Sequence, residues 1–146
     1  MVRYTSWNAE YLSTHAEEFA RNSTLSVLDY NDKQLEKRYK EDQYGGATPE
    51  ETLKLFVEAL EKKDFELASK YYVPEDQDAA LKKINNSDKV ALQNFIVAYS
   101  AGNIESTKLG SSGSYEVKIV GNDDPTPFIF ELRQNPFSKK WKIEER

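Results

Sequence analysis

Residues 48–72 read TPEETLKLFVEALEKKDFELASKYY, and this stretch predicts two successive helices with clear start signals. Thr48 is a capping residue type, Pro49 suits the first helical position, and Glu51 completes a capping box. Apolar residues then recur at helical spacing and predict one buried face, formed by Leu53, Phe56, Val57 and Leu60. Asp64 caps the second helix. The apolar face of that helix is formed by Phe65, Ala68, Tyr71 and Tyr72.

The composition predicts a folded domain and excludes several classes of site. The chain has 146 residues, of which 12% are aromatic, and this share is enough for a real core. Its net charge of −5 lacks the basic footprint of a nucleic-acid-binding protein. The absence of cysteine excludes disulfides, zinc–thiolate sites, iron–sulfur clusters and cysteine nucleophiles. No apolar run approaches the roughly 20 residues of a membrane helix, so no span is predicted.

The residues that could carry catalysis or bind metal form no recognisable set. His15 is the only histidine, which excludes a multi-histidine metal site, and it is expected to be a surface or hydrogen-bonded side chain. The loop around Ser111 lacks the pattern of a nucleophile elbow or a P-loop. Glu75–Asp78 lacks the glycine of a calcium loop and fits a helix N-terminus instead. We therefore predict no catalytic residue, no metal and no cofactor.

The N-terminal third predicts helices that are less tightly packed. Residues 6–21 carry an apolar face and begin with a capping serine. Residues 32–44 are helix-prone, but their apolar stripe is thin. Gly45-Gly46 breaks this pattern and predicts a boundary. Residues 1–46 are therefore expected to form a helical arm or stalk, and residues 47–146 a domain.

The sequence after the helical pair predicts further helices and then strands. A third helix is expected over residues 75–86. A fourth is expected over residues 88–101, capped by Ser87, and its nearly continuous apolar surface predicts the most buried helix. From residue 104 the period changes to the alternation of strands, separated by turns. Helices followed by strands predict an α+β fold, with the helices on one face of a curved antiparallel sheet of three to four strands.

Several short motifs within residues 47–146 resemble a known superfamily. They are the Pro-Glu helix start, Phe56 and Ala59 on the long helix, Lys63-Asp64-Phe65, Ala68 with the tyrosine pair, and the closing Trp141-Lys142-Ile143. Together they resemble the nuclear transport factor 2-like superfamily, which has a cystatin-like α+β cone. Because these motifs are structural, the resemblance implies a fold more strongly than a function. It also implies a bacterial, extracytoplasmic protein rather than a cytoplasmic one, with a signal or anchor outside this sequence.

The remaining functional signal is a set of aromatic residues. They are expected to meet where the helices cover the sheet, either as simple core packing or as the lining of an apolar pocket. The candidate ligand-binding residues are Tyr71, Tyr72, Tyr99, Tyr115, Phe130 and Trp141, with Phe128 beside them. In the second case, tyrosine hydroxyls would orient a small apolar ligand.

Three functions follow from these observations. The favoured one is a non-enzymatic domain that binds a small apolar ligand or a protein partner. The alternative, suggested by the same resemblance, is an enzyme of the ketosteroid isomerase or polyketide cyclase type, which needs a buried carboxylate of raised pKa near a tyrosine. A third is a homodimer formed through the outer sheet face, where Val120 and Ile129 interrupt a polar surface.

Overall fold

The helix α2 (Pro49–Glu61) begins with the predicted cap at Thr48. The amide of Glu51 donates to the Thr48 hydroxyl at 3.1 Å, and the Glu51 carboxylate accepts from the amide of Ala47 at 3.1 Å. The Thr48 half of the capping box is therefore made, while the Glu51 carboxylate reaches the amide one residue before the cap; both bonds fix the direction in which the chain enters α2.

The computed structural model describes residues 31–110 and 113–145. Residues 31–41 are helical, and a compact unit spans Arg38–Arg146. This unit begins nine residues before the domain start expected at residue 47, because residues 38–46 bond to later parts of the chain. The helix expected over residues 6–21 lies outside the described residues.

Three further helices and one short 3-10 turn follow α2. They are α3 (Phe65–Lys70), η1 (Pro74–Asp76), α4 (Gln77–Asn86) and α5 (Lys89–Ser100). Asp64 caps α3 as predicted, since its carboxylate accepts from the amide of Leu67 at 3.1 Å. The residue that caps α5 is Asp88, whereas Ser87 was expected. The Asp88 carboxylate accepts from the amide of Val90.

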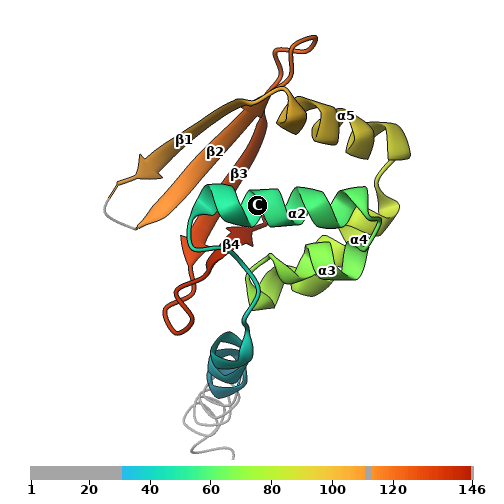
Figure 1. Ribbon diagram of the computed structural model, residues 1–146. Helices are drawn as coiled ribbons and strands as arrows, with labels where there is room; N and C mark the ends of the chain where they lie inside the picture. Colours follow the sequence, from blue (N-terminus) through green and yellow to red (C-terminus); the bar gives the residue numbers. More distant parts are fainter. Residues whose placement is uncertain (1–30, 111–112, 146) are drawn as a thin grey trace, which may run out of the picture. The chain divides into compact units, whose positions relative to one another are not determined.

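The last third of the described chain forms a four-stranded antiparallel meander. Its strands pair in sequence order: β1 (Asn103–Leu109), β2 (Ser114–Val120), β3 (Phe128–Gln134) and β4 (Trp141–Glu144). Helices followed by an antiparallel sheet make the fold α+β, as predicted. Figure 1 shows α2 lying across one face of this sheet.

The core forms where α2 meets the inner face of the sheet. The register aligns Val117 with Phe130 and Leu132 with Ile143, so these side chains share the inner face. They meet the apolar stripe of α2, in which Leu53 and Val57 are fully buried. Roughly 1.5–3 kcal/mol of burial free energy per large apolar side chain makes this interface the main source of stability.

The free edge of β4 is covered by two other segments. The amide of Trp141 donates to the carbonyl of Gly46 at 3.0 Å. The amide of Val73 donates to the carbonyl of Ile143, and the amide of Ile143 donates to the carbonyl of Tyr71, both at 2.9 Å. Gly45 is needed for this approach, whereas Gly46 lets the chain pass close to α2, where an added Cβ would lie 2.6 Å from the Cβ of Glu51. A Cβ at Gly45 (φ +129°) would lie 2.5 Å from the Trp141 carbonyl oxygen, so Gly45-Gly46 is a contact point and not a flexible break.

The helix α5 is far less buried than its composition predicts. Only Phe95 and Ala98 are buried, whereas Val90 is 64% exposed and Val97 is 56% exposed. The prediction that this is the most buried helix is therefore wrong. An apolar helix needs partners on all sides to be buried, and within the compact unit α5 contacts α2 and the β1–β2 side of the sheet.

Candidate functional site

Two of the six candidate aromatic residues belong to one cluster. Tyr72 and Phe130 both contact Phe56, with ring centroids 5.7 Å and 6.1 Å apart. Phe95 of α5 joins this cluster, since its centroid lies 5.3 Å from that of Phe130 and 5.2 Å from that of Phe128. The cluster thus connects α2, α5 and β3 through edge-to-face and tilted contacts, the geometries that aromatic rings prefer.

The other four candidates lie in separate contacts. Tyr115 and Trp141 pack edge to face at 5.2 Å, and Tyr71 pairs in the same way with Tyr44 at 6.3 Å. Tyr99 is half-buried against the core. Burial raises the pKa of Tyr72, the tyrosine of the central cluster, above its ordinary value of 10.0. Tyr72 is therefore a neutral hydroxyl at physiological pH.

An inner pocket of about 290 Å³ lies beside the aromatic cluster. Tyr72 and Phe130 line it, together with residues that the sequence did not single out as ligand-binding. The lining is Phe56, Leu60, Tyr72, Lys83, Ile84, Ser87, Ala91, Leu92, Phe95, Phe128, Ile129 and Phe130. Within this set there is no carboxylate, and Lys83 is bonded to Glu145 at 2.6 Å. The pocket is therefore suited to apolar groups and not to proton transfer by an acid.

A larger groove of about 830 Å³, called here the outer groove, adjoins the inner pocket. The two share Leu60, Ile84, Ser87 and Leu92. The apolar lining of the outer groove is Leu60, Phe65, Ile84, Val90, Leu92 and Ile96. Its polar lining is Glu61, Lys63, Asn85, Ser87, Lys89, Gln93 and Asn94. Its volume falls within the roughly 300–1,000 Å³ of small-molecule sites.

The groove lies between the apolar side of α5 and the end of α2, which do not pack closely enough to bury each other. Leu92 and Ile96 lie one turn apart on α5, and both are only half-buried. Leu60 and Phe65 form the facing wall, at the end of α2 and the start of α3. The apolar pattern of residues 88–101 was the sequence signal for this site, although it predicted burial and not a groove.

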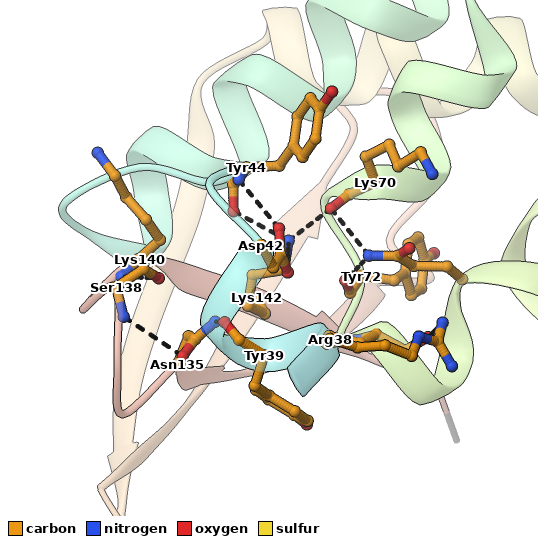
Figure 2. A network of polar contacts seen from close by, with 12 residues as sticks. Arg38, Tyr39, Asp42, Tyr44, Lys70, Tyr72, Asn135, Ser138, Lys140 and Lys142 are labelled. Atoms are coloured by element: carbon orange, nitrogen blue, oxygen red, sulfur yellow. Dashed lines mark hydrogen bonds and ion pairs between the residues drawn. The ribbon is translucent and has the colours of Figure 1, made fainter. Parts of the chain in front are cut away.

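A second cluster, which the sequence did not predict, surrounds Lys142. The alternation of β4 predicts a solvent-facing lysine, yet this side chain is fully buried. Its ammonium lies 2.8 Å from the Asp42 carboxylate and donates to the carbonyls of Tyr44, at 2.9 Å, and Lys70 (Figure 2). Burial lowers the pKa of Lys142, while Asp42 opposes this shift.

A polar contact beside Lys142 attaches the same segment to β3. The Tyr39 hydroxyl donates to the Glu75 carboxylate at 2.7 Å, and the Arg133 guanidinium bonds both groups. The buried side chain of Asn135 donates to the carbonyl of Tyr39 at 2.8 Å. These polar side chains are engaged with one another and with the backbone, so the contacts hold residues 38–44 against the end of β3.

The described residues contain neither a membrane-spanning helix nor a group of metal ligands. Their helices are too short or too polar to span a bilayer. Within residues 31–110 and 113–145, no three histidine, aspartate or glutamate side chains are grouped so as to hold a metal ion.

The inner pocket and outer groove are thus the best candidate site. Comparison with known proteins adds nothing to this geometry, because no protein-family model, curated protein or solved structure matches the chain.

Proposed function

We propose that this protein is a non-enzymatic binding domain that holds an apolar ligand in the outer groove and inner pocket. One observation carries the proposal: an apolar cavity of about 830 Å³ continues into an aromatic pocket between α5 and the sheet. Apolar surface that folding leaves exposed gains free energy when a ligand covers it, at about 25 cal/mol per Å². Contiguous exposed apolar surface of this kind usually marks a binding site.

The enzyme alternative requires a carboxylate inside this apolar cavity, near a tyrosine. The tyrosine is present, as Tyr72 lines the inner pocket. No carboxylate lines the inner pocket itself. Glu61 lines the outer groove, and an adjoining pocket of about 120 Å³, which shares Tyr72 and Phe130 with the inner pocket, is lined by four acids: Glu116, Glu131, Glu144 and Glu145. Two of these acids are paired with cations: Glu144 with Arg133 at 3.0 Å and Glu145 with Lys83 at 2.6 Å. The geometry therefore favours binding over acid–base catalysis.

The fold relationship to the nuclear transport factor 2-like superfamily is part of the proposal. It is supported by a long helix lying across the inner face of a four-stranded antiparallel sheet. The bacterial, extracytoplasmic setting that the resemblance implies stays a prediction, as does the dimer through Ile129, which is 54% exposed. Sedimentation would show whether that exposed face associates.

Thermal-shift measurements with apolar compounds test the proposed function. We expect a series of aliphatic and aromatic ligands to raise the melting temperature of the full chain, because they bind only the folded state. Leu92→Gln places an amide in the shared wall of groove and pocket and should reduce the shift. Val97→Gln, on the exposed side of α5, is the matched control and should leave it unchanged. Absence of any shift across the series would contradict the proposal.

A further inference from the structure

The outer groove is lined by charged residues as well as apolar ones. Lys63 follows α2 and Lys89 begins α5, so two lysines from separate elements line the groove and both are exposed. Glu61 is the acid in the same lining, which leaves a charge of +1. The neighbouring acids, Asp64 and Asp88, are engaged as helix caps. The groove thus joins an apolar wall to a rim that carries two ammonium groups and one carboxylate.

Lys63 also occupies a backbone position that normally requires glycine. Its φ is +58°, in the left-handed region. The amide of Lys63 donates to the Leu60 carbonyl at 3.0 Å, and that of Asp64 to the Ala59 carbonyl at 2.9 Å. These two bonds define a Schellman motif, in which the left-handed residue is usually glycine. A lysine here costs stability, and such a cost is common where a side chain is kept for function.

We propose that the ligand is a single-chain carboxylate amphiphile, with its tail in the inner pocket and its carboxylate at Lys63 and Lys89. The inference rests on the proposed function and names the ligand class of the same site. The inner pocket of about 290 Å³ is too small for an α-helix of about 10 Å diameter but admits a slender chain. Carboxylate and ammonium groups form charge-assisted hydrogen bonds at the rim.

Calorimetric titration of the full chain with three ten-carbon compounds tests the head group. At pH 8 and low salt, decanoate should bind more tightly than decan-1-ol, and decylammonium should bind most weakly. Added salt should weaken decanoate binding and leave decan-1-ol unchanged, because it screens the lysines. Octanoate should lose about fourfold in affinity per missing methylene, the value for a buried CH₂ group of ~0.8 kcal/mol.

Two glycine variants separate the role of the Lys63 side chain from the relief of strain. Lys63→Gly should raise the melting temperature by about 2–6 °C while weakening decanoate binding about two- to fivefold. Lys139→Gly is the matched control, since Lys139 also has a left-handed φ of +64° but lies in the β3–β4 turn. It should be stabilised similarly and bind decanoate as wild type does. Lys63→Gly combined with Lys89→Gln should weaken binding about tenfold.

The possible outcomes distinguish the two proposals. If decanoate and decylammonium bind equally, or if Lys63→Gly and Lys139→Gly behave alike toward decanoate, the carboxylate assignment is overturned while apolar binding stands. If none of the three compounds binds, both proposals fail.

Discussion

The region around Lys142 and the region around α5 are packed in opposite ways. Around Lys142, a fully buried ammonium is surrounded by Asp42 and two backbone carbonyls, which join three segments distant in sequence. Around α5, an apolar helix makes partial contact and leaves Val90 and Val97 in solvent. The first side is held by buried polar groups that bond to one another. The second keeps apolar surface available, which is what a binding site needs.

Burial does not follow residue type in either region. A lysine is the largest fully buried side chain, while the most apolar helix is largely exposed on one side. In both cases the arrangement of neighbouring elements decides. Variants near Lys142 should therefore change stability, and variants that line the groove beside α5 should change binding.

Removing the partner of the buried ammonium should destabilise the fold more than any other change considered. Asp42→Ala leaves Lys142 charged and without its carboxylate, so we expect a loss of about 3–5 kcal/mol in the free energy of unfolding, measured in urea. Glu41→Ala, one residue earlier and exposed, is the control and should change stability by less than about 0.5 kcal/mol.

A double variant sharpens this test. Asp42→Ala with Lys142→Met removes the charge as well as its partner, so it should be more stable than Asp42→Ala alone. If the double variant were the less stable of the two, the ammonium would not be the source of the loss.

An intermediate effect is expected from Tyr72 at alkaline pH. In the folded state its pKa is raised above 10.0, so the unfolded chain loses the phenolic proton first. This contribution to stability is complete below pH 10 and is lost as the pH rises above it. Urea unfolding of Tyr72→Phe at pH 9, 10 and 11 should show a slope shallower by about 1.4 kcal/mol per pH unit above pH 10. An unchanged slope would show that this hydroxyl does not titrate differently in the two states.

The smallest effect is expected on the exposed side of α5. Val97→Gln should change the free energy of unfolding by less than about 0.5 kcal/mol, because this side chain is 56% exposed. Val117→Gln, the same exchange at a fully buried strand position, should cost several times more. A loss above about 2 kcal/mol at Val97 would mean that another surface covers this helix in solution.

Sequence patterns predicted the elements better than their surroundings. The caps at Thr48 and Asp64 and the sheet order follow from local chemistry and alternation, and all are confirmed. The burial of Lys142 depends on Asp42, a hundred positions away in the chain, and no local pattern encodes that pairing. Period and propensity describe which face of an element is apolar, but not whether a neighbour covers it.

The candidate site was predicted only in part for the same reason. Tyr72 and Phe130 line the inner pocket as ligand-binding candidates, whereas Tyr115 and Trp141 pack on each other. All four were chosen as aromatic residues near the helix–sheet interface, and that criterion cannot distinguish one end of the interface from the other. The facing wall from α4 and α5, including Ile84 and Leu92, depends on tertiary packing.

Gly46 and Tyr71–Val73 bond to the edge of β4, so the two lateral edges of the sheet differ in whether they can pair with another strand. One lateral edge already has its backbone groups engaged, so an incoming strand can add only beside β1. There, Glu105 and Lys108 place charges on a short, solvent-exposed strand, an arrangement that discourages such addition. Within the described sheet, protection against edge-to-edge pairing therefore rests on the seven residues of β1.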